Sequence, residues 1–352
     1  MSDLPDGDLA DGDLPGGQPA ALEALPVPLA GGGVLHLPRY VLRGSAPGPH
    51  VAVLGAVHGD EYEGVVAAGA LLRGLARAGA VRRGRVTVVP VANPPAYASG
   101  TRVSPLDGLN LARIFPGDER GSPSERIAAV LSREVLRRAD FLIDLHSAGQ
   151  HYAMPLLCGA YSADDALGRA CQDAALAFGA PVLWAHPTIN PGRSLSVAID
   201  AGVPCLYAEC GGGGRVRRAD VDAYVRGVRR VLSHLGVLPP GPPPPPPPPA
   251  VRLRSDGDTD AALAVAHAGL LVSRAALLDG VAPGDVLGEV LDEAGAVLET
   301  LRSPAAGRVA LVRRTARVRP GDGAYLIAAE APPDGAVPYA TGPGAGAAAS
   351  TG

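Results

Sequence analysis

The sequence predicts an α/β protein with a mixed, largely parallel sheet and helices on both faces, followed by a small all-β domain. Two observations predict this. Up to about residue 238, short apolar runs typical of buried strands alternate with longer helix-like segments. Beyond the eight consecutive prolines of 242–249, the helix-like segments stop, and short strand-like runs follow one another between Gly and Pro turns.

In the first part of the chain, strands and helices are expected in strict alternation. We expect strands at 51–54, 85–91, 141–145, 181–184 and 204–209, and helices at 63–77, 124–139, 163–178, 195–201 and 219–235. A helix between consecutive strands can return the chain to the same end of the sheet, so the alternation favours parallel strands. In the second part we expect only strands, at 251–254, 266–272, 285–291, 296–301, 307–313 and 324–329.

The proline run also predicts the domain organisation. Eight prolines cannot form a helix or a ladder strand, so 239–250 is expected to be a stiff polyproline linker, although an SH3-type ligand is an alternative. It would join an α/β domain at 21–238 to a β-domain at 251–334. Residues 1–20 repeat Asp, Gly, Leu and Pro and are expected to be a disordered acidic tail, with a second disordered tail at 335–352.

Composition excludes several classes of protein. The 352 residues are 47% hydrophobic and 19% charged, as in a globular protein with a large core. The net charge is -4 and no basic patch is interleaved with aromatics, so nucleic-acid binding is not expected. No apolar run is long enough for a membrane span, and the acidic N-terminus lacks signal-peptide features, so a cytoplasmic protein without a membrane partner is expected.

Two predicted strands end in groups that can bind a metal. His58 and Glu61 follow the strand at 51–54, and His146 follows the strand at 141–145. Strand ends converge in an open α/β sheet, although a lone histidine in a turn is often only structural. Two imidazoles and one carboxylate would form a zinc site with one position open for water, which is typical of hydrolases.

Three further charged residues are candidates for chemistry. Glu209 closes an apolar strand, where a carboxylate is costly to bury unless it is catalytic, paired or capping a helix. Arg102 and Arg113 lie in the long connection 93–117, and long loops are often functional. A guanidinium there could bind a carboxylate or an oxyanion, or be an ordinary surface group.

Several motifs together resemble one known family. They are the runs Gly55-Ala-Val-His-Gly-Asp-Glu61, Asn93-Pro94, Arg102, Asp107-Gly108, Asn110-Leu111, Arg113, Phe115-Pro116-Gly117, Asp144-Leu-His-Ser147 and Glu209-Cys-Gly-Gly212. In order and spacing they resemble the succinylglutamate desuccinylase/aspartoacylase family, which is related to the zinc carboxypeptidases. The likeness covers roughly residues 30–330, because members also carry a β-domain after the catalytic one.

The resemblance implies roles for most of these residues. It implies that His58, Glu61 and His146 bind one zinc ion per chain. It also implies that the domain at 21–238 is the zinc-hydrolase domain, with Glu209 as the general base and Arg102 polarising the scissile carbonyl.

Substrate binding is implied for Arg113, which would hold a carboxylate, and for Arg193, which precedes the last but one helix. One position departs from the family. Where the family reads Asn-Leu-Asn-Arg, this chain has Ala112 in place of the second Asn, and Asn110 or a water is expected to compensate. We expect this change to alter specificity without abolishing activity.

The sequence therefore predicts a zinc-dependent amidohydrolase that acts on linear, non-peptide amides. Its partner would be a small N-acyl amino acid or a related N-acylated amine, and assembly into a homo-oligomer is left open. A metallocarboxypeptidase acting on peptide C-termini is the first alternative. A non-catalytic binding protein on the same fold is the second.

Overall fold

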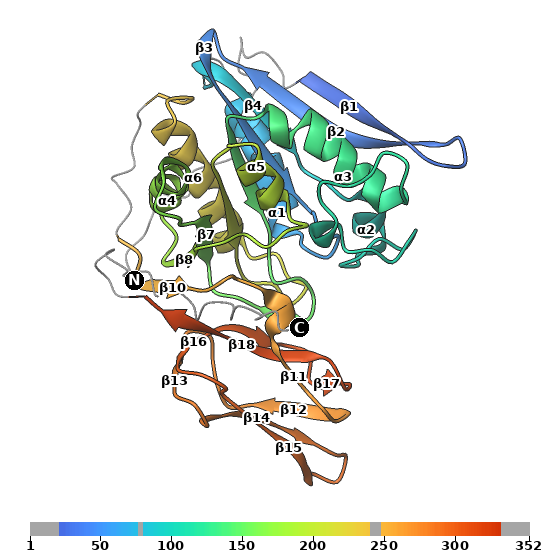
Figure 1. Cartoon of the computed structure of the whole chain (residues 1–352), viewed down its shortest axis with the longest axis vertical. Coiled ribbons are helices and arrows are strands. Elements are labelled where there is room, and N and C mark those ends of the chain that lie inside the picture. Colours follow the sequence, from blue (N-terminus) through green and yellow to red (C-terminus); the bar gives the residue numbers. More distant parts are fainter. Residues whose placement is uncertain (1–20, 77–79, 240–247, 332–352) are drawn as a thin grey trace, which may run out of the picture.

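The computed structural model describes residues 21–76, 80–239 and 248–331 (Figure 1). Both predicted tails, 1–20 and 335–352, and most of the predicted polyproline linker at 239–250 lie outside the described residues. In the described part, the molecule has an α/β region with a separate antiparallel sheet region at its C-terminal end, as the fold class predicted (Figure 1).

The α/β region is built on one long mixed sheet. Its strands run in the spatial order β1-β2-β4-β3-β5-β9-β7-β8-β10. They are β1 (Ala21–Pro28), β2 (Val34–Arg43), β3 (Ala46–Gly55), β4 (Arg83–Val89), β5 (Phe141–Leu145), β7 (Leu157–Tyr161), β8 (Val182–His186), β9 (Cys205–Glu209) and β10 (Val251–Arg254). The central strands β4, β3, β5 and β9 are parallel neighbours, whereas β1 and β2 add an antiparallel edge.

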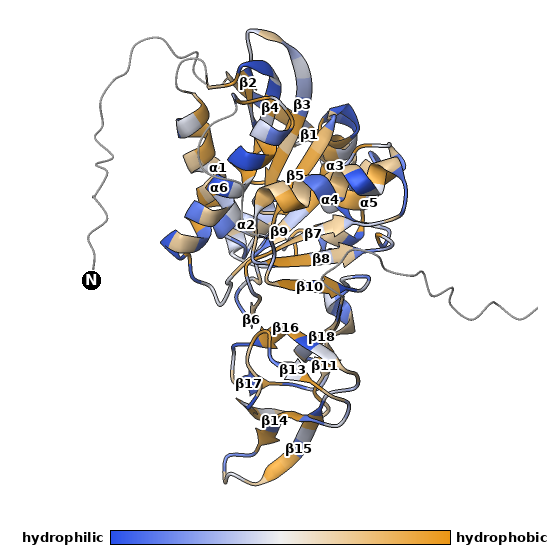
Figure 2. Ribbon diagram, turned by 90° about the vertical axis from the view of Figure 1, so that its left-hand side faces the viewer, coloured by the Kyte–Doolittle hydropathy of each residue, from blue (hydrophilic) through white to orange (hydrophobic). Residues whose placement is uncertain are grey.

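Helices cover both faces of this sheet. They are α1 (Glu63–Leu75), α2 (Pro94–Ser99), α3 (Pro123–Glu134), α4 (Ala166–Phe178), α5 (Ser194–Asp200) and α6 (Arg218–His234), with short 3-10 turns η1 (Leu111–Arg113) and η2 (Leu136–Arg138). One group, α1, α4 and α6, packs together; α3, α5 and η2 form the other. The central strands are buried on both sides, which explains why they are continuous apolar runs. In Figure 2 these strands are mostly orange, whereas the helices also carry blue residues.

The C-terminal region continues from the sheet edge. Strand β10 pairs in parallel with β8 and antiparallel with β18 (Gly323–Glu330), so hydrogen bonding runs from the α/β sheet into β18 and β16 (Gly307–Arg313). A second sheet has the order β15-β14-β12-β17. Its strands are β12 (Gly269–Ser273), β14 (Val286–Leu291), β15 (Val297–Arg302) and β17 (Arg317–Val318). The short pieces β6 (Tyr152–Ala153), β11 (Leu263–Ala264), β13 (Gly280–Val281) and η3 (Thr259–Ala261) complete the region.

Most predicted elements are found, with shifted ends. The predicted helix at 124–139 is divided into α3 and η2. Helix α4 begins at Ala166, three residues later than predicted, after the cap Asp165, whose side chain accepts from Gly168 N. Helix α3 begins at Pro123 and is capped by Ser122, which forms a capping box with Glu125. The sequence did not predict β1, β2, α2, β7 or the two-residue strands β6, β11, β13 and β17. Strands β1 and β2 contain prolines and polar residues that obscure strand periodicity.

No helix within the described ranges has both the length and the apolar character that crossing a bilayer demands.

Candidate active site

The site lies where three parallel strands end. Strands β3, β5 and β9 are neighbours, and their register aligns Gly55 with Leu145 and Leu145 with Ala208. The residues that follow are therefore brought to one edge of the sheet: His58 in the turn after β3, His146 directly after β5, and Glu209 at the end of β9. This is the position at which open α/β sheets bind ligands.

In the turn after β3, the residue with a positive φ is Ala56, at 47°, whereas neither Gly55 nor Gly59 has one. Gly59 is needed for space, because a Cβ there would overlap the backbone of Ala96 in α2. Close packing of α2 against this turn thus holds the segment that carries His58.

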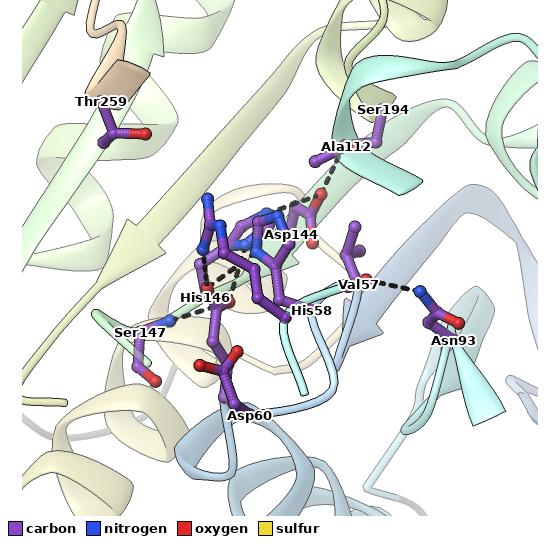
Figure 3. Close-up of polar contacts among 12 residues, drawn as sticks. Val57, His58, Asp60, Asn93, Ala112, Asp144, His146, Ser147, Ser194 and Thr259 are labelled. Atoms are coloured by element: carbon purple, nitrogen blue, oxygen red, sulfur yellow. Dashed lines mark hydrogen bonds and ion pairs between the residues drawn. The ribbon is translucent and has the colours of Figure 1, made fainter. Parts of the chain in front are cut away.

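The three predicted metal ligands converge on one point. Nδ1 of His58 lies 2.7 Å from one oxygen of Glu61, and Nδ1 of His146 lies 2.9 Å from the other. Their candidate ligand atoms all lie within 4.8 Å of one another, and the three residues are buried. Figure 3 shows the two histidines side by side, with Asp144 beside them.

The outward nitrogens of both imidazoles are held by oxygen atoms. Nε2 of His58 lies 3.0 Å from Oδ1 of Asn110, and Nε2 of His146 lies 3.2 Å from Oδ2 of Asp144. Ser194 donates a short hydrogen bond to the same Asp144 oxygen. Histidines that bind metals typically donate their second ring N–H to such an oxygen, which fixes the tautomer and turns the other nitrogen inward. The residues therefore fit a zinc ion, both in the type of ligand atom and in the hydrogen bonds that orient the two imidazoles.

Glu61 is the most strongly constrained group of the cluster. It also accepts hydrogen bonds from Ser147 N at 3.2 Å and from a guanidinium nitrogen of Arg102 at 3.2 Å. Burial alone would raise the pKa of Glu61, but the charges and hydrogen bonds of His58 and His146 outweigh it and hold that pKa well below its ordinary value. Glu61 is thus an anion, as a metal ligand must be.

Glu209 differs from Glu61 although the two are close neighbours. Burial, together with the charge of Glu61, raises the pKa of Glu209 to about 8, while His146 and Arg102 oppose the shift. Its Oε2 is buried and has no hydrogen-bond partner among the described residues. A divalent cation beside it would favour the carboxylate and lower this pKa. An unpartnered carboxyl with a pKa near neutrality is typical of a group that exchanges protons.

The arginine predicted to polarise the scissile carbonyl and the two predicted to bind substrate reach the same cavity. Arg102, Arg113 and Arg193 all line a cavity of about 220 Å³ that also contains the histidines and Glu209. Arg113 and Arg193 are not free, because each is paired with an aspartate from the segment around η3. Nε of Arg113 lies 2.7 Å from Asp260, and a guanidinium nitrogen of Arg193 lies 3.0 Å from Asp258.

Asn110, which was expected to compensate for Ala112, is not among the residues that line the cavity. Its side-chain oxygen is shared by His58 Nε2 and the backbone N–H of Ala112, so it supports a predicted metal ligand. Ala112 itself lines the cavity, where its small side chain leaves room. Asn110 is therefore placed to orient His58, and direct contact of its oxygen with substrate is not favoured by this geometry.

The sequence reading missed several residues of the site. Asp144 had a visible signal, because residues two apart on a strand point to the same side, which places Asp144 beside His146. Tyr207 had the same relation to Glu209 and also lines the cavity. His186 and the aspartates near η3 had none, since they lie far away in the sequence.

Comparisons with known proteins agree with this geometry. The succinylglutamate desuccinylase/aspartoacylase catalytic domain matches residues 47–235. The N-alpha-acetyl-L-2,4-diaminobutyric acid deacetylase of Halomonas elongata is 35% identical over 300 residues, which cover 84% of this chain and 86% of that protein.

Solved structures are similar over nearly the whole chain. A succinylglutamate desuccinylase/aspartoacylase from Rhodobacter sphaeroides has a TM-score of 0.78 at 31% identity, covering 89% of this chain and 95% of its own. The product-bound ectoine utilization protein EutE of Ruegeria pomeroyi has a TM-score of 0.78 at 30% identity, covering 88% and 94%. With the strand-end cluster and the matching domain together, this chain belongs to the succinylglutamate desuccinylase/aspartoacylase family.

Proposed function

We propose that this protein is a zinc-dependent amidohydrolase that removes the acyl group from a small N-acyl amino acid. The observation that carries the proposal is the convergence of His58, Glu61 and His146 at a cavity that also contains Glu209, whose buried Oε2 has no hydrogen-bond partner among the described residues. Because its relative from Halomonas elongata is named for an N-acetyl diamino acid, an N-acetyl diamino acid is the first substrate to test.

We assign the metal to the inward atoms of the cluster. Nδ1 of His58, Nδ1 of His146 and the Glu61 carboxylate would hold one zinc ion, with Asn110 and Asp144 orienting the imidazoles. When bound, zinc supplies a Lewis acid for the amide carbonyl and lowers the pKa of water toward neutrality.

Glu209 is the proposed general base and acid. As water attacks the amide carbonyl, Glu209 takes up the proton that the water loses, and it returns this proton to the departing amine nitrogen. Its buried, unpartnered oxygen supports this role, since no protein donor competes for it among the described residues.

Arg102 and Arg113 are proposed to bind different parts of the substrate. Arg102 already donates to Glu61 and is partly exposed to the cavity, so its remaining N–H groups can donate to the developing oxyanion. Arg113, supported by Arg193, is proposed to bind the substrate carboxylate.

The cavity favours a small molecule over a peptide. Its volume of about 220 Å³ is below the roughly 300–1,000 Å³ of ordinary drug-sized ligand sites. It is walled partly by residues from the C-terminal region, such as Asp260 and Leu311. The metallocarboxypeptidase alternative requires a more open groove. Cytoplasmic location remains a prediction from the sequence.

The decisive experiment combines Glu209→Gln with direct metal analysis. The variant should keep one zinc per chain but lose about 10²- to 10⁴-fold in kcat on an N-acetyl diamino acid. Glu134→Gln on α3 is a matched surface control and should behave like the wild type. Undiminished turnover by Glu209→Gln would refute the mechanism. Turnover of short peptides in preference to N-acetyl amino acids would favour the carboxypeptidase alternative.

A further inference from the structure

An acidic segment from the C-terminal region forms one wall of the cavity. It comprises Asp256, Asp258 and Asp260, which follow β10 and end in η3. Asp256 and Asp260 line the cavity together with the predicted zinc ligands and Glu209. Figure 3 shows the intervening Thr259 on a separate segment across from the histidines. The site therefore includes carboxylates that none of the proposed catalytic steps uses.

Asp258 has a supporting role. Its carboxylate binds Arg193 at 3.0 Å, lies 3.8 Å from Arg113, and accepts the backbone N–H of Asp260 as the cap of η3. The positive charges of Arg113 and Arg193 repel one another, and Asp258 between them offsets this repulsion. It is occupied by protein partners and is not available to a ligand.

Asp260 is placed differently. One of its oxygens accepts from Nε of Arg113 at 2.7 Å, but its side chain is 62% exposed and reaches the cavity. The hydrogen bond from Arg113, with the charges of Arg102 and Arg193, holds the pKa of Asp260 below its ordinary value, so the group stays anionic at neutral pH. Asp260 can therefore accept a second cation while it remains bound to Arg113.

The pair Arg113–Asp260 presents opposite charges next to each other on the cavity wall. A substrate that carries only carboxylates would meet attraction from Arg113 and repulsion from Asp260. A substrate with one carboxylate and one ammonium, a few bonds apart, can satisfy both groups at once. The pairing thus discriminates between acidic and basic amino acids.

We propose that Asp260 selects N-acyl amino acids whose side chain carries an ammonium group, by binding that ammonium while Arg113 binds the α-carboxylate. This inference rests on the proposed deacylase function. Asp256 is less suited, because its charge acts on His186, whereas Asp260 is hydrogen-bonded to Arg113 itself.

The test compares two N-acetyl amino acids of nearly equal shape. N-acetyl-L-2,4-diaminobutyrate ends in an ammonium, and N-acetyl-L-norvaline ends in a methyl group at the same position. We expect wild-type kcat/KM to favour the first, and Asp260→Asn to reduce the ratio of the two values about two- to fivefold, as for an ion pair with a largely exposed carboxylate. Asp260→Asn should also raise kcat/KM for N-acetyl-L-glutamate, a gain that general damage to the fold would not produce.

Two variants control for charge and for structure. Asp260→Glu keeps the charge and should retain most of the ratio. Asp222→Asn removes an aspartate that is ion-paired at 2.9 Å with Arg218 on α6, outside the cavity, and should leave the ratio unchanged. An unchanged ratio in Asp260→Asn, or an equal loss on both substrates, would overturn the inference.

The proposed function can fail separately. If the zinc-loaded wild type hydrolyses none of the three N-acetyl amino acids, the deacylase proposal is wrong. Calorimetric binding of free 2,4-diaminobutyrate and norvaline to wild type and Asp260→Asn would then still measure the selectivity. Equal affinities of the two amino acids for the wild type would refute the role of Asp260.

Discussion

Replacement of Asp144 should weaken zinc binding although Asp144 is not itself a proposed ligand. The carboxylate is fully buried and faces Nε2 of His146 at 3.2 Å. Asp144→Asn keeps an oxygen acceptor but removes the negative charge. A charge-assisted hydrogen bond contributes about 1.5–3 kcal/mol and a neutral one about 0.5–1.5 kcal/mol, so the change costs about 1–1.5 kcal/mol, or roughly tenfold in Kd.

Asp144→Ala should cost more. It leaves the buried Nε2–H of His146 and the hydroxyl of Ser194 without their acceptor. Loss of such a supporting group typically weakens metal binding 10- to 100-fold, and we expect the upper end because Ser194 is buried and the His146 side chain is only 11% exposed.

The assay is zinc competition with a chromophoric chelator on the metal-free proteins, with thermal unfolding measured alongside. Asp107→Asn is the matched control, because Asp107 accepts from the backbone and hydroxyl of Ser124 at 2.7 and 2.8 Å but does not line the cavity. It should lower stability and leave the zinc Kd unchanged. Wild-type zinc affinity in both Asp144 variants, or an equal loss in Asp107→Asn, would refute the reasoning.

Two further predictions concern the wall of the cavity. Burial lowers the pKa of His186 to about 4, so as pH falls below about 6.5 the imidazole is protonated in the unfolded chain before it is protonated in the folded one. Between pH 7 and pH 5, the free energy of unfolding should therefore fall by about 2 kcal/mol more in the wild type than in His186→Gln. Urea titration of both proteins at both pH values measures this difference. An equal pH dependence in both proteins would contradict this. At Gly159, a Cβ would overlap the ring of Tyr207, so Gly159→Ala should lower the free energy of unfolding by about 1–3 kcal/mol and also lower kcat/KM. Gly69→Ala on α1 is the control, because only the tip of Arg73 is near, and it should be neutral or stabilising in thermal unfolding. A Gly159→Ala protein as stable and active as the wild type would show that Tyr207 is free to move.

The fold class and the cluster of His58, Glu61 and His146 could be predicted because the sequence patterns that indicate them span only a few neighbouring residues. Strands such as β3 and β5 are apolar on both faces, and each is followed directly by polar residues that can bind a metal. Convergence of these residues follows from the general geometry of parallel sheets. Asp144 was within reach of the same reasoning, since it shares a strand face with His146.

Other parts could not be predicted because they depend on contacts between distant segments. Strand β10 was expected in a separate β-domain, yet it adds to the α/β sheet beside β8, a pairing that no local pattern specifies. The ion pair of Arg113 with Asp260 joins residues 147 positions apart. The environment of Glu209 also depends on neighbours, because burial and Glu61 together raise its pKa.

By itself, the sequence determined which chemical groups are present and that His58, Glu61, His146 and Glu209 follow buried strands. Hydrophobic periodicity and turn residues act over a few positions, so they specify such local placement. The tertiary structure alone decided which oxygen orients each imidazole, which carboxyl is kept protonatable, and which aspartates face the arginines of the cavity. These depend on strand register and on packing of the C-terminal region against the site, which arise only when the whole chain is folded.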